Sequence, residues 1–535
     1  MVDPQGGGLS PRNRPQKTKG RPWLVPVIVV GAVLLTAIGF AAVKSMKTSD
    51  TVTATEAAGQ ADATTDAGGD EASTDTTQVL DPDQQPLPPY DGWVNPASSG
   101  RMWSEKVPGV LTFRGNPTRT YYGKGPVPKA PKILWSYPET GAMCGKSTDG
   151  SGTQTWCGMG WTGNPNVYET GGKTIVSFGA YDYAVHWIDY NTGADVLPPF
   201  KTGDIIKGTV TTDPDGFPLT YSGSRDNYYR ILATDRPQPV ELWKLSAYDG
   251  VQQMWNDDWD GSGLIIDDYL FEGGENSWFY IVKLNRAYGP DGKVTVNPEI
   301  VFKTPGWDAE ELKYITDRQV SIENSVAISG NTVYFANSGG LVQGWDITGL
   351  KAGKTPERIF RFWTGDDTDA SVVIDKDGFL YVGSEFERHN ERSTQIGQIM
   401  KLDPRKPDDP LVWSVKDESP GKQGIWGTLA LANGVVYADT NGGRVLGIDQ
   451  MTGQVLWQKE LKSQTWPSPV VVDNVLIVGD CKGVLHAWDV SNPTVDPPEI
   501  WTVQLDGCIE ATPTVWKGRI FVGARGGKMY AIGDS

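Results

Sequence analysis

The sequence predicts an all-β protein whose main domain is a closed ring of eight four-stranded blades, a β-propeller. Three observations lead to this prediction: a short phrase that returns eight times, a four-strand pattern between its copies, and a spare strand ahead of the first copy. The phrase has a small or proline-containing start, a hydrophobic run and a turn, and it recurs roughly every 50 residues, at the long end of propeller-blade periods. Its copies start at Asn164, Gly208, Gly261, Asn324, Ala370, Gly427, Ser468 and Thr512.

Each repeat contains the signals of four short strands. After the phrase come a turn and a second apolar strand, as in 331–335, and then a glycine turn such as 441–443. Glycine tolerates the positive φ that tight hairpins require. A third strand ends in an aspartate such as Asp449, and a fourth carries an aromatic residue such as Trp457. Four strands joined by hairpin turns form one propeller blade.

The two ends of the repeat region predict how the ring closes. The last repeat stops at 531–532 and has no fourth strand, whereas a strand-like segment at 132–137 stands before the first phrase. We expect this segment to pair with the last three strands and complete the eighth blade. Closure of that kind leaves no open sheet edge on which other chains could aggregate.

Two segments carry a resemblance to a known family. The run 448–457 reads Ile-Asp-Gln-Met-Thr-Gly-Gln-Val-Leu-Trp, and the run 187–193 reads Trp-Ile-Asp-Tyr-Asn-Thr-Gly. Both resemble the repeat of pyrroloquinoline-quinone (PQQ)-type propellers; the resemblance covers about residues 108–533, within a predicted propeller domain of 108–535. It implies the fold, and it is less specific for function, because this superfamily includes quinoprotein dehydrogenases, outer-membrane assembly scaffolds and uncharacterised surface proteins.

The residues before the ring predict a membrane anchor. Residues 22–43 are apolar and uncharged and are long enough to span a bilayer. The basic tail 1–21 then lies in the cytoplasm and the propeller outside, as a single-pass protein of the cell membrane. A cleaved signal peptide remains the alternative. Residues 44–107 are predicted to be a disordered, acidic, Thr- and Ala-rich stalk and lead-in, because such a composition cannot bury enough apolar area to order itself.

The charge balance limits which partners the protein can bind, and the cysteine content indicates the compartment in which it lies. The chain has 65 acidic and 48 basic residues, a balance that argues against nucleic-acid binding. Its four cysteines suggest two disulfides in an oxidising compartment. Cys144 and Cys157 flank a Gly/Ser/Thr-rich loop, and Cys481, in the hairpin turn of the seventh blade, is expected beside Cys508, before the inner strand of the eighth. Free thiols or a metal site are the alternatives, and the lack of Cys-x-x-Cys spacing disfavours a metal.

Candidate ligand-binding residues gather where propellers bind ligands, in the loops entering the inner strands and in the turns between second and third strands. These candidates are Trp161, Asp257, Asp258, Trp259, Asp260, Glu275, Asn276, Glu323, Asp366, Asp367, Asp369 and Trp426. Crowded carboxylates suit Ca²⁺, for which the candidates are Asp258, Asp260, Glu275 and Glu323. Aromatic rings beside acids also suit sugars or organic cations. Solvated loop acids and turn-capping residues are the plainer interpretation.

The sequence favours a binding protein over an enzyme without settling the matter. It contains no metal-hydrolase motif, nucleophile elbow, phosphate loop or haem-attachment sequence. The first hypothesis is therefore a membrane-tethered binding or scaffold module of the cell envelope, with an envelope protein or glycan as partner. The second is a PQQ- and Ca²⁺-dependent dehydrogenase, although the adjacent-cysteine disulfide that often packs on the quinone in such enzymes is absent. The third is a polysaccharide-binding propeller. The arginine-containing segment 113–119 could cap the ring or face a partner.

Overall fold

The computed structural model describes residue 83 and residues 85–149, 152–161 and 163–535. The predicted tail 1–21, the predicted span 22–43 and residues 44–82 of the predicted stalk and lead-in lie outside these residues, whereas residues 83 and 85–107 of that segment are described. Within the part of the chain that is described, no helix has the length and apolar character needed to cross a bilayer.

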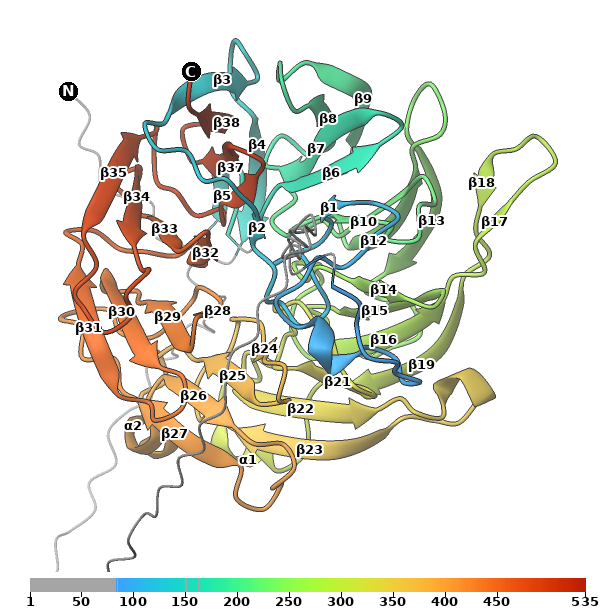
Figure 1. Cartoon of the computed structure of the whole chain (residues 1–535). Coiled ribbons are helices and arrows are strands. Elements are labelled where there is room, and N and C mark those ends of the chain that lie inside the picture. The colour runs from blue at the N-terminus through green and yellow to red at the C-terminus, as the bar shows by residue number, and fades with distance from the viewer. Residues whose placement is uncertain (1–82, 84, 150–151, 162) are drawn as a thin grey trace, which may run out of the picture. The chain divides into compact units, whose positions relative to one another are not determined.

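The described chain forms eight antiparallel four-stranded blades around a central axis, as predicted (Figure 1). Blade 1 contains β6 (Asn166–Thr170), β7 (Lys173–Ala180), β8 (Ala184–Asp189) and β9 (Asp195–Lys201). Blade 2 contains β10 (Thr211–Thr212), β11 (Leu219–Ser222), β12 (Tyr228–Ala233) and β13 (Val240–Ser246). Blade 3 contains β14 (Leu264–Ile266), β15 (Tyr269–Gly273), β16 (Trp278–Lys283) and β19 (Glu299–Pro305). Blade 4 contains β20 (Ala327–Ser329), β21 (Thr332–Phe335), β22 (Leu341–Asp346) and β23 (Glu357–Trp363).

The second half of the ring repeats this order. Blade 5 contains β24 (Val373–Ile374), β25 (Leu380–Gly383), β26 (Ile399–Leu402) and β27 (Leu411–Val415). Blade 6 contains β28 (Ala430–Ala432), β29 (Val435–Asp439), β30 (Arg444–Asp449) and β31 (Val455–Glu460). Blade 7 contains β32 (Val470–Val472), β33 (Val475–Gly479), β34 (Val484–Asp489) and β35 (Glu499–Gln504). Blade 8 contains β36 (Thr514–Trp516), β37 (Arg519–Ala524), β38 (Lys528–Gly533) and β3 (Lys132–Tyr137).

A few elements stand outside the blades. Two hairpins are formed by β4 (Cys144–Asp149) with β5 (Gly152–Cys157), and by β17 (Ala287–Tyr288) with β18 (Val294–Thr295). The short helices are the 3₁₀ turns η2 (Pro96–Ser98) and η3 (Leu350–Ala352) and the α-helices α1 (Glu311–Tyr314) and α2 (Glu391–Ile396).

The ring closes through the predicted N-terminal strand. In Figure 1 the blue-green β3 lies beside the red β38, and the two pair antiparallel with Lys132 opposite Gly533 and Tyr137 opposite Met529. A strand from the start of the ring's sequence and one from its end are thus joined by a ladder of backbone hydrogen bonds, and the prediction of closure is confirmed.

The eightfold phrase has a physical cause that the structure reveals. In most copies its Ser or Thr hydroxyl accepts a hydrogen bond from the backbone N–H of the same position one blade earlier, as in Ser325 to Ser371 and Ser371 to Thr428, both at 2.9 Å. Four further bonds of this type run from Asn164 to Thr209, Ser262 to Ser325, Thr428 to Ser468 and Ser468 to Thr512. A buried N–H without a partner costs about 1–3 kcal/mol. A Ser or Thr at this position supplies the hydroxyl oxygen that accepts the N–H, which explains why these residues recur. We call this group the ring hydroxyl.

The centre of the ring is filled by segment 108–124, the plug. Its strand β1 (Gly109–Val110) pairs antiparallel with β6 of blade 1, and its strand β2 (Gly123–Lys124) pairs parallel with β36 of blade 8. Between them, the carbonyl oxygens of Leu111, Pro117 and Thr118 accept N–H groups from blades 2, 4 and 5. The plug therefore rises into the ring and returns on the same side.

Two buried arginines of the plug bind the remaining blades. Arg114 donates to the carbonyl oxygens of Leu429 and Pro469, in blades 6 and 7, at 2.8 and 2.9 Å. Arg119 donates to the carbonyl oxygen of Ser262, in blade 3, at 2.8 Å. Together with its strand and carbonyl contacts, the plug is hydrogen-bonded to all eight blades. The segment 113–119 accordingly lies inside the ring, and it blocks the central channel.

Buried carboxyl groups accompany the two guanidinium groups. Burial lowers the pKa of Arg119 to about 9, and the charge of Glu272 opposes that shift. Burial raises the pKa of Asp439 to about 8, against the attraction of Arg114. Glu272 and Asp439 are only 2% and 1% exposed, so each sits in the apolar interior near a positive charge.

The described part of the lead-in packs on one face of the ring. Trp93 donates its indole N–H to the carbonyl oxygen of Ile347 at 2.8 Å, and Val94 forms a bridge with Gly330. Ser104 donates to the carbonyl oxygen of Pro214. Gly330 and Pro214 lie in turns between first and second strands, so the chain enters the ring from the face opposite the hairpins that join second and third strands.

Candidate functional site: the channel mouth

In blades 2 to 8, three positions of each blade build the mouth of the channel that the plug fills. The outer loop position lies four residues before the ring hydroxyl, the inner loop position lies two residues before it, and the turn position lies between the second and third strands. In blades 2 to 8 the N–H of the turn position donates to the carbonyl oxygen of the outer loop position at 2.7–3.0 Å, so the three positions are fixed alike around the ring. The residues at the inner loop position are Lys207, Asp260, Glu323, Asp369, Trp426, Trp466 and Glu510. Those at the turn position are Arg225, Glu275, Ser338, Glu385, Asn441, Cys481 and Arg525.

Blades 2 and 3 form a cluster of three carboxylates and two cations, which we call the 2–3 cluster. The ammonium group of Lys207 contacts Asp260 and lies 3.2 Å from Glu275 and 3.7 Å from Asp258. The guanidinium group of Arg225 lies 2.5 Å from Asp258. Burial raises the pKa of Asp258 and of Asp260, and both cations counteract it at Asp258. Three of the four predicted Ca²⁺ ligands thus surround an ammonium group of the protein itself.

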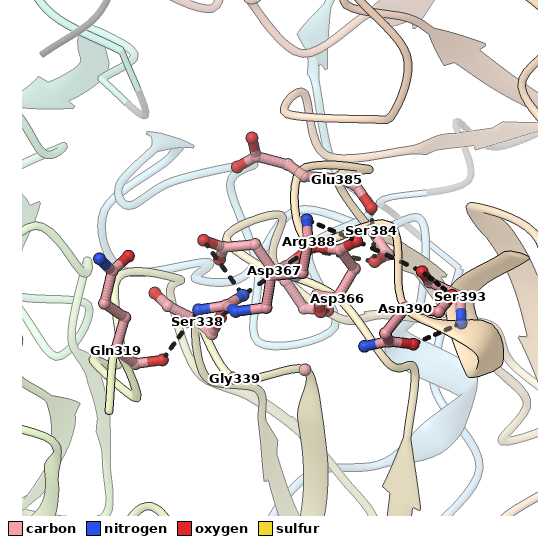
Figure 2. Close-up of polar contacts among 12 residues, drawn as sticks. Gln319, Ser338, Gly339, Asp366, Asp367, Ser384, Glu385, Arg388, Asn390 and Ser393 are labelled. Carbon is pink, nitrogen blue, oxygen red and sulfur yellow. Dashed lines mark hydrogen bonds and ion pairs between the residues drawn. The ribbon is translucent and has the colours of Figure 1, made fainter. Parts of the chain in front are cut away.

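Blades 4 and 5 form a second acidic cluster, the 4–5 cluster, of which Figure 2 labels Asp367 and Glu385. Ligand atoms of Asp367, Asp369 and Glu385 all lie within 4.8 Å of one another. The hydroxyl of Ser338 lies 2.9 Å from Asp369 and 3.1 Å from Glu323, which joins the fourth predicted Ca²⁺ ligand to this set. All four carboxylates are buried, with exposures between 0% and 7%.

Asp366 has a separate role beside this cluster. Its carboxylate accepts the backbone N–H groups of Arg388 and His389 at 3.0–3.1 Å and the hydroxyl of Ser393, so it fixes the turn that carries Arg388. The guanidinium group of Arg388 lies 3.9 Å from Asp366 and from Asp367, and it binds Asp317 more closely, at 3.1 Å. Figure 2 shows Asp367 and Glu385 extending away from Asn390 and Ser393, at the start of α2.

The other side of the mouth is aromatic. The ring centroids of Trp161 and Trp426 are 6.2 Å apart, and those of Trp426 and Trp466 are 5.2 Å apart. The Cys481–Cys508 disulfide packs against these rings, and it joins the turn position of blade 7 to the outer loop position of blade 8. The three indoles are 3–8% exposed. Blade 8 contributes two charged residues to the mouth, Glu510 and Arg525, which form an ion pair at 2.9 Å.

Both predicted disulfides are present. The Cys144–Cys157 bond closes the β4–β5 hairpin, in which the two cysteines stand directly opposite each other. This hairpin contacts mouth residues of two blades: its Trp156 ring lies 4.8 Å from the Arg525 guanidinium and 5.9 Å from that of Arg225.

Three of the residues predicted to bind a ligand instead make packing contacts or hydrogen bonds within the protein. Trp259 is 1% exposed and packs between Tyr229 and Tyr280 in the core of blades 2 and 3. Asn276 donates to the carbonyl oxygen of Ala247 and to the Tyr280 hydroxyl, as a turn-capping residue does. Asp257 accepts a hydrogen bond from Tyr248 at the periphery.

Lys207, Arg225, Ser338 and Glu385 complete the two clusters and are not among the predicted ligand-binding residues. The sequence contains a pattern that would have located these mouth positions. Between the two loop positions stands one buried apolar residue in several blades, namely Ile206, Trp259, Ile322, Ile425 or Ile509. Extended chains alternate their side chains between two sides. Aligning the repeats on the ring hydroxyl therefore separates mouth positions from the core position between them.

Comparisons with known proteins agree with the architecture. A family model described as outer membrane protein assembly factor BamB matches residues 395–496. A protein named outer membrane protein assembly factor BamB, from Shewanella oneidensis, is 27% identical over 124 residues, which is 23% of this chain and only 29% of that protein's length.

Solved structures extend the likeness over most of the ring. Quinohemoprotein alcohol dehydrogenase from Comamonas testosteroni aligns with a TM-score of 0.53 at 15% identity, covering 80% of this chain and 81% of that one. The computationally designed protein Ika8 aligns with a TM-score of 0.52 at 14% identity, covering 75% of this chain and all of the design. At such identities the likeness concerns the fold alone. The strand order makes this chain an eight-bladed β-propeller, and residues 395–496 are similar to the matched repeat family.

Proposed function

We propose that this protein is a membrane-tethered, extracytoplasmic binding module of the cell envelope, and that the channel mouth is its binding surface. The observation that carries this proposal is the plug. Because segment 108–124 is hydrogen-bonded to all eight blades at the centre of the ring, the plug lies beneath the mouth, and a partner would approach the mouth from its outer side. The described lead-in packs on the opposite face and so does not cover the mouth.

Sequence features support the tether and the compartment. The uncharged run 22–43 with basic residues before it favours an anchor with the propeller outside, and two disulfides suit an oxidising compartment. The partial match to an outer membrane assembly factor supports an envelope protein as partner.

The charges of the mouth argue against PQQ as a resident cofactor. PQQ is a tricarboxylic acid, so a site for it needs positive groups that are free to bind carboxylates. Among the mouth cations, Lys207, Arg225 and Arg525 each already contact a buried carboxylate of the protein, Arg388 binds Asp317, and Lys422 lies exposed over the Trp426 ring. The 4–5 cluster adds four more carboxylates on the same side of the ring. The donor set therefore does not fit an anionic quinone, and we derive no redox step for this protein.

A site-specific crosslinking experiment tests the binding surface. A photoreactive amino acid replaces the exposed Lys422, whose ammonium group lies 5.0 Å from the Trp426 ring at the mouth. A matched control replaces the exposed Lys517, in the turn between β36 and β37 on the opposite face. In the full chain in its native membrane, we expect irradiation to attach a discrete envelope protein or glycan at position 422 and not at 517. Equal labelling at both sites, or none at 422, would contradict the proposal.

A further inference from the structure

A cleft of about 370 Å³ lies between blades 5 and 6, which are neighbours in the ring (Figure 1). Its wall on the blade 5 side is the end of β27 together with the residues that follow, and its wall on the blade 6 side is formed by β30 and β31. Small molecules bind in protein clefts of roughly 300–1,000 Å³, so this volume is large enough for a small ligand. We call it the side cleft.

The side cleft coincides with an exception to the repeat. Leu446, the third residue of the third strand of blade 6, belongs to the lining of the cleft. In six other blades the equivalent residue has a polar side chain: His186, Arg230, Tyr280, Gln343, His486 and Tyr530. Two of these reach the preceding blade, since His186 is hydrogen-bonded to Tyr137 and Gln343 donates to the carbonyl oxygen of Gly306. Leucine has no polar group with which to bridge blades 5 and 6 in this way.

Arg444 brings a guanidinium group to the side cleft. It lines the cleft together with Gln458, whose side-chain oxygen accepts a hydrogen bond from that group, and its side chain is only 11% exposed. The carboxylate of Asp417 lies 3.4 Å from the guanidinium group, and it accepts the backbone N–H groups of Ser419 and Gly424 more closely, both at 2.9 Å. A guanidinium group has five N–H donors, so these two contacts leave donors for a ligand.

We propose that the side cleft binds a carboxylate group attached to a short aliphatic body. The N–H donors of a guanidinium group form a planar fork that matches the two oxygens of a carboxylate. Val415 and Val455 provide an apolar surface for the aliphatic part. The exposed Lys416 and Glu418 also line the cleft with opposite charges, which favours a ligand with one carboxylate over a ligand with two.

This site is separate from the channel mouth. The cleft lies beside the outer strands β27 and β31, whereas the mouth is formed by the loops that enter the inner strands and by the turns between second and third strands. The inference therefore does not depend on the function proposed for the mouth. A free carboxylic acid and the C-terminus of a peptide share the chemistry that the cleft would recognise.

Titration calorimetry of the full chain at constant ionic strength tests the proposal. N-acetyl-leucine has both the carboxylate and the aliphatic body, N-acetyl-leucinamide lacks the carboxylate, and acetate lacks the body. We expect saturable binding of N-acetyl-leucine, and binding weaker by about tenfold or more for the other two. N-acetyl-glycyl-glycyl-leucine represents the C-terminus of a peptide, and the tighter of the two leucine acids identifies the source of the carboxylate.

Two variants locate the site, and a third is their control. Arg444→Lys keeps the positive charge and removes the planar fork, so it should weaken binding of N-acetyl-leucine by about tenfold. Val455→Trp places a bulky side chain at a 37%-exposed position of the cleft wall, and it should abolish binding while the Tm of the unliganded protein changes little. Val240→Trp, at a 41%-exposed position of β13 in blade 2, should leave binding unchanged.

Three outcomes would overturn the proposal. These are the absence of saturable N-acetyl-leucine binding by the native protein, equal binding of N-acetyl-leucinamide, and native-like binding of N-acetyl-leucine by Val455→Trp. Equal binding of the amide would show that the guanidinium group of Arg444 recognises no carboxylate. Because Val455 is partly exposed, its variant gives a clear result even if Arg444→Lys fails to fold.

Discussion

The 2–3 and 4–5 clusters present the same carboxylates on the same backbone, yet they are neutralised differently. In the 2–3 cluster, Lys207 and Arg225 come from the preceding blade and complete the arrangement within the protein. In the 4–5 cluster, the preceding blade adds another carboxylate, Glu323, and the nearby Arg388 stands 3.9 Å away with its closer contact at Asp317. The repeat thus fixes where the charges lie, and the residues of the preceding blade decide which groups stand beside them.

The largest effect is expected where a cation is removed from the self-sufficient cluster. Lys207→Met leaves Asp258, Asp260 and Glu275 buried around an apolar side chain, and breaking a buried ion pair costs about 3–5 kcal/mol. Urea unfolding should show this loss of stability. Lys376→Met, at a lysine that is 72% exposed, is the matched control and should change little. A stability loss as small as that of the control would mean that the carboxylates are not held by Lys207.

A proton is a third way to neutralise a buried carboxylate, and Asp439 tests it. Burial raises the pKa of Asp439 to about 8, above its usual value of 3.8, so the folded state holds a proton that the unfolded state releases. Its contribution to stability is therefore present below about pH 4 and is lost as the pH rises to 8. Asp439→Asn should remove this loss and make the protein more stable than the native chain at pH 9, on the order of 2 kcal/mol.

The measurement is the free energy of unfolding of both proteins between pH 4 and pH 9. Their difference should grow with pH across this window. Parallel pH profiles would show that Asp439 does not titrate there.

The smallest effect is expected at Arg388. Because this guanidinium group stands 3.9 Å from Asp366 and Asp367 and is partly solvated, Arg388→Met should cost about 1–2 kcal/mol, less than Lys207→Met. Arg405→Met, which breaks an exposed ion pair with Asp403, provides the control in the same urea experiment. A cost as large as that of Lys207→Met would mean that Arg388 neutralises the 4–5 cluster as Lys207 neutralises the other, and the contrast between the clusters would disappear.

The periodic features of the sequence were the ones that could be predicted. Blade number, closure by 132–137 and the Cys481–Cys508 bond all follow from residues that hold equivalent places in the repeat. The plug could not be predicted, because it precedes the repeats, has no period of its own and forms its bonds over long sequence distances, such as 355 residues between Arg114 and Pro469.

The mouth was predicted in part, and the reason lies in alternation along the chain. Asp258 and Asp260 lie at the mouth, while Trp259 between them belongs to the core. The acidic residues stand close together in the sequence, whereas the cations that contact them come from another blade. Lys207 is 51 or more positions away from its carboxylate partners, so only the folded ring shows that they belong together.

The plug also has a mechanical consequence. The N-terminal chain joins the ring at its hub and is bonded there to every blade, while the closing strand β3 follows the plug at the rim. A pulling force applied through the N-terminus would act on the hydrogen bonds of the plug before it reached the closing strand β3. Such a connection would protect the closing strand β3 from force in a domain that is attached to a membrane through its N-terminal chain.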